Sequence, residues 1–483
     1  MTMGRITEHP ILDFNKGKKV TFMFNGTPVE GFEGESVAAS LHAAGIRKLH
    51  ESEVLHRPRG LFCAIGNCSS CVMRVNGEDN VRICVTPVRE GLVVEEQARK
   101  AVLDPEKRHL PGSLRPKTEI TTDVLVIGGG PAGMNAALEA ASHGLKVILL
   151  ERNGKPGGQL IKQTHKFFGS EKAKAGTRGF VIADELMEAI AASPDIEVMT
   201  GTTALGIFRD GTVMAEKDGM VISFHAGANI VSVGAFEKTL IFPGNDLPGI
   251  YGAGAVQTLM NTEGVVPGST VVMVGAGNIG LIVSYQLLQA GVRVAAVVEA
   301  APNFGGYEVH ANKLRRANVP ILTGHTIKYA YGGDRLEGVV LTALDSHFKP
   351  VPGTEKGIRC DFVCMAVGLS PLSELFFQSG CEMKFIPELG GYVPKIDEYR
   401  RTTVKGLYAA GDASGIEEAT SAQLTGRIAA LTASNDLKPV DHFEELYRSY
   451  SEQLLALRSG PLGGKILAGD AKLRQEGGVD YEK

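Results

Sequence analysis

Short apolar runs alternate with helical stretches along the chain from Thr121 onward. Each apolar run has about the length of one strand, and the stretch after it carries apolar residues at helical spacing. This alternation is typical of a parallel sheet with helices on its faces. The pattern occurs twice, with glycine fingerprints that begin at Gly128 and Gly275. We therefore predict an α/β fold that contains a duplicated nucleotide-binding unit.

Residues 1–100 follow a different pattern. Polar and apolar positions alternate around Asn25-Gly26, which is a two-residue hairpin signal. A helix is expected after the capping residue Ser36, ending at Gly45. A second hairpin is expected over 72–75 and 81–85, around Asn76-Gly77. Two hairpins around one helix resemble a β-grasp ferredoxin.

The charge balance excludes two classes of partner. The chain has 50 Lys and Arg against 54 Asp and Glu, a net charge of −4. It therefore has no bulk positive field for nucleic acid or anionic lipid, and we expect neither as a partner. Seven unevenly placed cysteines and an N-terminus without a signal-like apolar stretch favour a reducing cytoplasm.

The segment 264–292 contains no charged residue and could be mistaken for a membrane span. Its six glycines, together with Pro267 and polar amides, would make a poor lipid-facing helix. We expect a buried strand, a glycine turn and a packed helix instead.

Four cysteines carry the strongest chemical signal. Cys63, Cys68, Cys71 and Cys84 are spaced C-x4-C-x2-C-x12-C, and the first three match the plant-type [2Fe-2S] loop. Zinc usually recruits paired C-x2-C elements, and a cytoplasmic compartment disfavours disulfides. A dithiol pair at Cys68 and Cys71 would leave the other two without a purpose. The remaining cysteines, Cys360, Cys364 and Cys381, are expected to pack in cores.

The first fingerprint joins a strand, a glycine turn, a helix and a second strand that ends at Glu151. In such a unit the glycines allow a sharp turn, close approach to a pyrophosphate, and tight helix packing. Glu151 is placed to accept the ribose hydroxyls, and Gly157-Gly158-Gln159 adds a second close-approach loop. The candidate cofactor-binding residues here are Gly128, Gly130, Pro131, Ala132, Gly133, Glu151, Arg152, Gly158 and Gln159.

A later element is expected to complete this first site. The run 403–412 reads as a strand leading into Gly411-Asp412, with a helix to follow from about Ala419 to Ala433. In two-domain flavoproteins such an element returns to the first fold, where the Asp accepts a hydrogen bond from the ribityl chain. A surface turn would explain Gly-Asp but not the apolar run before it. Together these features favour FAD.

The second fingerprint contains Gly275, Gly277 and Gly280, and its second strand ends at Glu299. An acidic residue at that strand end, with no Arg in the following Ala-Ala-Pro, favours NAD(H) over NADP(H). The alternative is a duplicated domain that kept its packing glycines after losing its ligand. No C-x2-C accompanies this fold, and no acid–base group stands out, so we assign no catalytic residue.

The predicted fold class is α/β, a tandem Rossmann-like flavoprotein with two dinucleotide-binding domains and an N-terminal β-grasp [2Fe-2S] ferredoxin domain. The predicted domains are the ferredoxin-like domain at 1–100, a linker at 101–120, an FAD-binding domain split over 121–262 and 386–435, an NAD(H)-binding-like domain at 263–385, and a C-terminal helix and tail at 436–483.

These motifs and the stretch 55–60, Leu-His-Arg-Pro-Arg-Gly, give the chain a family resemblance. It resembles the alpha, or A-type, flavoprotein subunits of dye-linked dehydrogenases: the hydrogen cyanide synthase, opine oxidase, proline/hydroxyproline dehydrogenase and sarcosine oxidase group. The resemblance implies a hetero-oligomer in which an amine-oxidase-like beta subunit oxidises the substrate, often with FMN at the interface. No cysteine follows Cys381, so we do not expect the additional C-terminal cluster that relatives often carry.

Three functions are compatible with these features. The leading hypothesis is an electron-relay subunit of a flavin-dependent amino-acid or amine dehydrogenase, which passes electrons to a further acceptor. The second is a self-sufficient NADH-dependent ferredoxin-type reductase, suggested by Glu299 and the second fingerprint. The third is a non-catalytic scaffold subunit that binds nucleotides.

Overall fold

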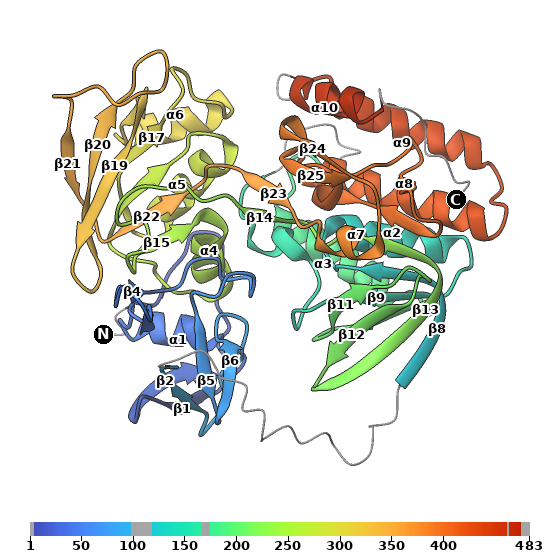
Figure 1. Cartoon of the computed structure of the whole chain (residues 1–483), viewed down its shortest axis with the longest axis horizontal. Helices are drawn as coiled ribbons and strands as arrows, with labels where there is room; N and C mark the ends of the chain where they lie inside the picture. The colour runs from blue at the N-terminus through green and yellow to red at the C-terminus, as the bar shows by residue number, and fades with distance from the viewer. Residues whose placement is uncertain (1–3, 98–117, 167–173, 461–462, 475–483) are drawn as a thin grey trace. The chain divides into compact units, whose positions relative to one another are not determined.

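The structure is a computed structural model that describes residues 4–97, 118–166, 174–460 and 463–474 (Figure 1). The chain divides into two compact units. One comprises Met1–Leu110 and Glu237–Gly368, and the other comprises Pro111–Phe236 and Leu369–Lys483. Most of the predicted linker at 101–120 and the end of the predicted tail lie outside the described residues. The last positions of that linker, from Thr118, belong to a strand.

The N-terminal part of the first unit is a five-stranded sheet with one helix against it. The first hairpin turns at Asn25-Gly26 as predicted, and the first strand also pairs in parallel with a late strand. The Ser36 hydroxyl caps the helix by accepting a hydrogen bond from the Ala39 N–H. The sheet order is β2 (Thr27–Phe32), β1 (Lys19–Phe24), β7 (Val93–Glu95), β5 (Val72–Val75) and β6 (Glu78–Arg82), with α1 (Val37–Ala43) and a small hairpin of β3 (His50–Glu51) and β4 (Pro58–Arg59).

The rest of the first unit is a parallel sheet with helices on one face and an antiparallel meander on the other. Its strands, in order, are β15 (Ile250–Gly252), β22 (Phe362–Met365), β16 (Thr270–Val274), β17 (Arg293–Glu299) and β18 (Ile321–Thr323). The helices are α4 (Ala253–Gln257), the π-helical turn η4 (Thr258–Thr262), α5 (Asn278–Gln289) and α6 (Glu308–Arg316), and the meander is β19 (His325–Gly332), β20 (Leu336–Ala343) and β21 (Lys356–Arg359).

The uncharged segment 264–292 therefore forms the predicted strand, glycine turn and helix. Side chains alternate across β16, so that Val272 and Val274 pack toward the meander while Val271 and Met273 pack on the other side. Within the described part of the chain, no helix is long and apolar enough to cross a membrane.

The ferredoxin-like part and the second dinucleotide fold share one hydrophobic core. Phe22 and Met73 of the former belong to the same buried cluster as Tyr251 and Leu281 of the latter. Backbone hydrogen bonds also join them, including one of 2.9 Å from the Ile6 N–H to a carbonyl in the loop before β16. The two parts are thus packed as one body, although about 140 residues separate them along the chain.

The second unit is built on a seven-stranded sheet whose central strands are buried on both faces. Val124 and Val126 face a cluster that includes α2 and α8, whereas Leu125 and Ile127 face the opposite cluster. The strand order is β10 (Ile196–Met199), β9 (Val147–Leu150), β8 (Thr118–Ile127), β13 (Met220–Val231), β12 (Val213–Lys217) and β11 (Thr203–Ile207), with β26 (Leu407–Ala409) paired to β13.

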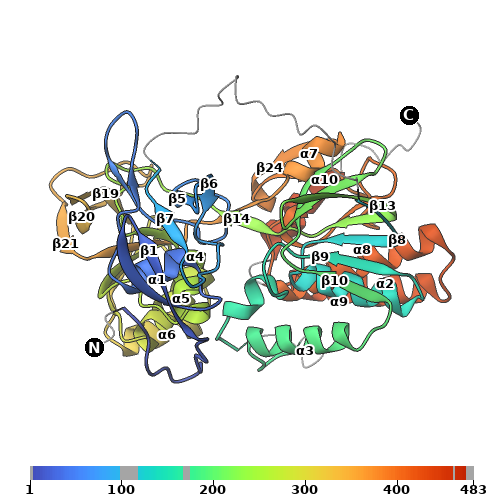
Figure 2. The same ribbon diagram turned by 90° about the horizontal axis from the view of Figure 1, so that it is seen from below.

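Helices cover this sheet from both ends of the sequence. α2 and α8 pack on one face, and α9 packs on α8 (Figure 2). The remaining elements are α2 (Pro131–Ser142), η2 (Gly158–Lys162), α3 (Gly179–Ala191), α7 (Glu374–Ser379), β24 (Met383–Ile386), η5 (Pro387–Leu389), β25 (Gly391–Pro394), η6 (Gly411–Ser414), α8 (Ala419–Leu437), α9 (Phe443–Arg458) and α10 (Gly464–Arg474), and β14 (Ala235–Glu237) pairs with β23 (Leu369–Pro371).

One predicted strand is shorter than expected. Only Leu407–Ala409 of the run 403–412 pairs with β13, and Gly411–Ser414 forms a 3-10 turn. The residues before Leu407 make a tight local loop, in which the Leu407 N–H donates to the Val404 carbonyl. An apolar run alone did not reveal this turn.

Candidate functional site

The first glycine loop, between β8 and α2, gives each of its three glycines a different role. Gly128 has a φ of +108°, which favours glycine. A Cβ on Gly133 would lie 1.8 Å from the Gly128 carbonyl oxygen, so no side chain fits there. A Cβ on Gly130 would meet only the Gly158 Cα, at 4.0 Å. Gly130 thus leaves open space at the N-terminus of α2, which is the cradle that a pyrophosphate needs.

Glu151 ties the end of β9 to this loop. One carboxylate oxygen accepts a 3.0 Å hydrogen bond from the Gly129 N–H, and the other accepts from the Asn153 backbone and side chain. Burial raises the pKa of Glu151, while these N–H donors act in the opposite direction. The Gly157 N–H donates to the Gly129 carbonyl, so the second close-approach loop lies against the first.

The side chains flanking these loops differ in exposure. Arg152 and Gln159 are exposed, Pro131 is half-buried and Ala132 is buried. Lys162, at the end of η2, is buried. Sequence reasoning did not single out Lys162, because a lysine in a short polar segment gives no sign of its burial.

The structure brings Gly411 and Asp412 to the start of α2. Gly411 has a φ of +63°, and a Cβ there would lie 2.8 Å from the Ala132 Cβ. The Asp412 carboxylate accepts a 3.2 Å hydrogen bond from the Glu417 N–H. Burial raises the pKa of Asp412 to about 7, and the negative charge of Glu417 adds to the rise.

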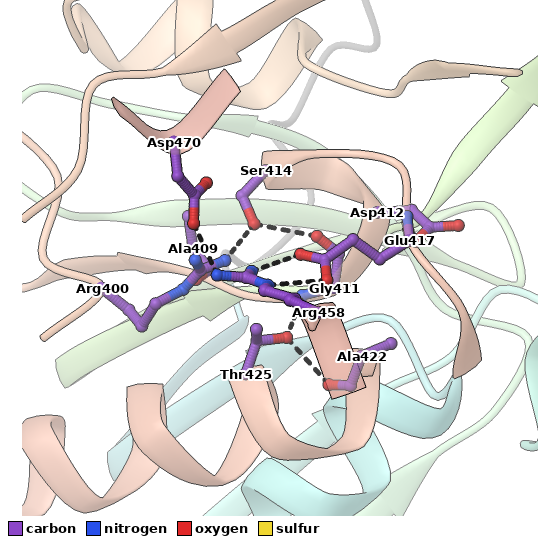
Figure 3. A network of polar contacts seen from close by, with 10 residues as sticks. All are labelled: Arg400, Ala409, Gly411, Asp412, Ser414, Glu417, Ala422, Thr425, Arg458 and Asp470. Atoms are coloured by element: carbon purple, nitrogen blue, oxygen red, sulfur yellow. Dashed lines mark hydrogen bonds and ion pairs between the residues drawn. The ribbon is translucent and has the colours of Figure 1, made fainter. Parts of the chain in front are cut away.

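A network of polar contacts holds this turn from outside (Figure 3). Arg400 donates to the Ala409 carbonyl at 3.1 Å and to the Ser414 hydroxyl. Arg458, from α9, forms an ion pair with both carboxylate oxygens of Glu417. Sequence reasoning missed both arginines, because the partners Arg458 and Glu417 are 41 residues apart and no local motif links them.

The four cysteines of the ferredoxin-like part are neighbours. The Cys63 thiol interacts with the thiols of Cys68 and Cys84, and Cys71 interacts with Cys84. These contacts lower the pKa of Cys63 and of Cys71 despite their burial. The Gly66 N–H lies 3.3 Å from the Cys84 sulfur, and the Cys68 N–H lies 3.4 Å from the Cys63 sulfur. Such donors stabilise thiolates.

The described residues contain no group of three or more His, Cys, Asp or Glu side chains arranged to hold a single metal ion. A [2Fe-2S] cluster requires a different arrangement, because its four thiolates are shared between two irons. Four adjacent thiols on a loop with inward backbone N–H groups fit that requirement.

The cysteine loop rests on the carboxyl end of β15. The Phe62 carbonyl, next to Cys63, accepts a 3.1 Å hydrogen bond from the Gly252 N–H. Arg59 forms an ion pair of 2.7 Å with Asp246, just before β15. Ligands of open parallel sheets bind at the carboxyl ends of the strands, so the cysteine loop and the second glycine loop share one edge of this sheet.

The second glycine loop repeats the geometry of the first. Gly275 has a φ of +100°, and a Cβ on Gly280 would lie 1.9 Å from the Gly275 carbonyl oxygen. A Cβ on Gly277 would meet nothing within 4 Å. Glu299 accepts hydrogen bonds from the N–H groups of Ala276 and Ala301, as Glu151 does from its own loops. This fold has therefore kept both its packing glycines and its open cradle.

A cavity of about 540 Å³ lies beside the end of β17, lined by residues that include Pro302, Phe304 and Arg315. The guanidinium of Arg315 is paired with Glu308 at 2.9 Å. The side chain that could reach a 2′-phosphate thus already has an acidic partner, in keeping with the expected preference for an unphosphorylated ribose.

The other three cysteines are buried. Burial raises the pKa of Cys360 to about 12, and it raises the pKa of Cys364 well above the usual range. Because the thiolate is the reactive form of cysteine, these residues give no support for dithiol chemistry beside the second fold.

Comparisons with known proteins bear on both parts of the chain. Residues 122–426 match the family model described as pyridine nucleotide-disulphide oxidoreductase, and residues 17–99 match a 2Fe-2S iron-sulfur cluster binding domain. The A-type subunit of opine oxidase from Agrobacterium tumefaciens (strain Ach5) is 30% identical over 335 residues, which are 66% of this chain and 66% of that protein. The alpha subunit of sarcosine oxidase from Rhizobium meliloti (strain 1021) is 27% identical over 479 residues, covering 86% of this chain and 45% of that protein.

Among solved structures, L-proline dehydrogenase from P. horikoshii superposes with a TM-score of 0.72 at 25% identity, over 94% of this chain and 79% of that chain. The chain spans two thirds or less of the length of these curated relatives. The predicted fold class and the predicted family resemblance are confirmed by these matches.

Proposed function

Because the chain belongs to the pyridine nucleotide-disulphide oxidoreductase family and carries a 2Fe-2S cluster binding domain, we propose that it is the electron-relay subunit of a hetero-oligomeric flavin-dependent amino-acid or amine dehydrogenase. Its relatives among the opine oxidase and sarcosine oxidase subunits support this interpretation, as does its likeness to an L-proline dehydrogenase. The observation that carries the proposal is a complete dinucleotide cradle in a chain that also brings four cysteines together.

The first fold is the proposed FAD site. Gly130 leaves room for the pyrophosphate, Glu151 stands where ribose hydroxyls would be held, and Asp412 is brought to the same loop by Gly411. Bound FAD would supply the ability to take up two electrons and release them one at a time. The residues of this chain bind and orient the nucleotide, and none is assigned as a proton donor or acceptor to substrate.

The proposed ligands of the [2Fe-2S] cluster are Cys63, Cys68, Cys71 and Cys84. Support comes from the proximity of their thiols and from the matched domain, whose residues 17–99 include all four. The substrate would be oxidised on a beta-type partner of the amine-oxidase class, with FMN at the interface as a further proposed cofactor. All seven cysteines are free, which supports our proposal of a cytoplasmic protein.

A second candidate function is an NADH-dependent reductase. The observation that favours it is the second fold, where Gly277 leaves an open cradle and Glu299 is held as Glu151 is. We propose NAD(H) as the nucleotide of this fold. NADH would then reduce the flavin of the same chain without a partner.

One anaerobic experiment separates these functions. Purified full-length protein is mixed with NADH, and the flavin absorbance near 450 nm is followed. Rapid bleaching would establish the reductase and overturn the relay as the main function. No bleaching by NADH, with bleaching by an amine only after a beta-type subunit is added, is the expected result. Absence of both would leave the nucleotide-binding scaffold as the function and would contradict the proposal.

A further inference from the structure

Arg458 is a charged side chain buried at the edge of the first dinucleotide site. Its side chain is 8% exposed and lies near the C-terminal end of α9. It donates to both carboxylate oxygens of Glu417, with Nε at 2.9 Å, and its third nitrogen pairs with Asp470 of α10. Burying a guanidinium with two carboxylates costs solvation, so the arrangement calls for a reason beyond packing.

Glu417 connects this ion pair to the turn that carries Asp412. The Glu417 N–H donates to the Asp412 carboxylate, while its own carboxylate is held by Arg458. In Figure 3 the Asp412 side chain points away from Arg458. Arg458 thus acts on Asp412 through Glu417 and not by direct contact.

We propose that Arg458 is a positioning residue for the nucleotide of the first fold: by neutralising Glu417, it keeps Asp412 in the carboxylate form that accepts a hydrogen bond from a ligand hydroxyl. This inference rests on the proposed FAD site. It assigns the C-terminal helices α9 and α10 a role in nucleotide binding that neither glycine fingerprint suggests.

The charges around the turn agree with this role. Glu417 belongs to the turn region itself, Arg400 reaches it from before β26, Arg458 comes from α9 and Asp470 from α10. Burial is the main reason that the pKa of Asp412 is raised to about 7, and among these groups it is the Glu417 charge that raises it further. Removing the Arg458 charge would leave Glu417 unbalanced and raise the pKa of Asp412 again.

The test measures FAD affinity across pH 5.5–9 for the full-length chain and four variants: R458Q, R458K, E417Q and the double variant E417Q/R458Q. FAD binding is read by flavin fluorescence on protein stripped of nucleotide. For the wild type, affinity should fall up to about tenfold per pH unit below pH 7, because protonated Asp412 no longer accepts as a carboxylate. In R458Q the fall should begin at higher pH, with FAD bound at least tenfold more weakly at pH 7.5.

The double variant separates charge from tethering. If Arg458 acts by neutralising Glu417, then E417Q/R458Q should regain most of the wild-type affinity, and E417Q alone should shift the fall to lower pH. R458K should keep part of the effect because it retains the charge. R401Q is the control, since Arg401 is ion-paired with Asp436 in the same unit without contacting Glu417, and its pH profile should match the wild type.

Two results would overturn the inference. Equal loss of FAD from R458Q and from E417Q/R458Q would show that Arg458 only tethers α9. An R458Q profile with the wild-type pH dependence would show that Asp412 does not depend on Glu417. Failure of the proposed function is read separately, from wild-type protein that contains no FAD and does not bind it at any pH, and it would remove the ligand on which the inference depends.

Discussion

At the scale of single residues, glycines in the two fingerprints are required for different reasons. Gly128 and Gly275 need a positive φ, and Gly133 and Gly280 have no room for a side chain. These needs come from the fold itself, so they persist whether or not a ligand binds. Gly130 and Gly277 have ordinary backbone angles and open space. The absence of a side chain at the middle glycine thus points to a ligand.

The first prediction follows from that difference. Gly130→Val should fold, because its Cβ meets no atom closer than 4.0 Å, but its side chain would fill the space proposed for the pyrophosphate. We expect FAD content to fall by at least tenfold with little change in melting temperature. The measurement is flavin per chain after purification.

Gly277→Val is the matched control, since it makes the same change at the same helix position in the second fold. It should keep its FAD. Loss of FAD from Gly277→Val and not from Gly130→Val would place the flavin in the second fold.

A second prediction concerns the cysteine loop. Cys68→Ser should abolish the paramagnetic signal of the reduced cluster and the onward transfer of electrons, because a hydroxyl is a poor substitute for a thiolate iron ligand. FAD content should stay within about a fifth of the wild-type value, since the proposed flavin site lies in the other unit. Iron analysis and electron paramagnetic resonance check this.

Cys381→Ser provides the comparison. Cys381 is buried and lies near the Thr403 hydroxyl, where a serine could also hydrogen bond. It should keep full iron content. Normal iron in Cys68→Ser, or one zinc per wild-type chain, would contradict the cluster assignment.

At the scale of elements, the sequence predicted what short-range signals determine. Ser36 caps α1 and Asn25-Gly26 turns the first hairpin, because capping and turn geometry depend on a few adjacent residues. The second hairpin has the predicted turn, but β6 begins at Glu78 and not at the predicted Val81. A strand's ends depend on its partner strand, and that partner is not visible in local sequence.

The site divides in the same way. The glycine loops, Glu151 and the cysteines sit in spaced motifs and could be selected from sequence. Lys162 and Arg458 could not, because their burial depends on segments far away in the chain. The functional roles of the selected residues stay a prediction that the variants above would test.

A third prediction concerns Glu263, which follows the π-helical turn η4. Its carboxylate accepts a 3.4 Å hydrogen bond from the Ser36 N–H, at the contact between the second fold and α1. Burial raises the pKa of Glu263 to about 7 from 4.5, and the nearby Glu35 adds to the rise. Between these values the folded state binds more protons than the unfolded state, so the unfolding free energy falls as pH rises from about 4.5 to 7.

Glu263→Gln should remove this loss. Relative to wild type, the variant should gain stability between pH 5 and pH 8, by at most about 3 kcal/mol. Urea unfolding of unit 1 at the two pH values measures the difference. The exposed Glu30→Gln serves as control, since Glu30 is paired only with Lys19 at the surface, and it should show no pH-dependent gain. Parallel pH curves for wild type and Glu263→Gln would contradict the prediction.

At the scale of the whole molecule, the sequence predicted the components but not how they pack. The ferredoxin-like part and the second fold were expected as separate domains, whereas they share a hydrophobic core within one unit. Their common core depends on side chains such as Phe22, Met73 and Tyr251, and each of these reads as an ordinary core residue of its own part. No local pattern says which core a buried residue joins.

The fourth prediction is that the isolated chain oxidises no amine. The sequence is occupied by a ferredoxin-like part, two dinucleotide folds and C-terminal helices, with no separate substrate domain among the described residues. We expect no reduction of dye by proline, hydroxyproline, sarcosine or opines with the purified chain alone, and activity only with a beta-type subunit. Obligate complexes of this kind bury more than about 2,000 Å², so co-purification should reveal the partner.

Dye reduction by the single purified chain with any of these substrates would refute the relay hypothesis. It would instead require a substrate pocket beside the first glycine loop. A chain that binds a beta-type subunit but stays inactive with every substrate tested would contradict the proposed reaction class while leaving the complex intact.

The shared core of the first unit also has a consequence for synthesis on the ribosome. Residues 1–97 leave the exit tunnel early, but the part of the chain that covers them ends at Gly368, about 270 residues later. At roughly 5–20 residues per second, the wait lasts about 15–50 s. During that interval the nascent ferredoxin-like part exposes apolar surface and all four thiols to chaperones, oxidants and cluster-delivery proteins. The order of the parts along the chain thus leaves a time window in which iron–sulfur insertion competes with aggregation before the polypeptide is finished.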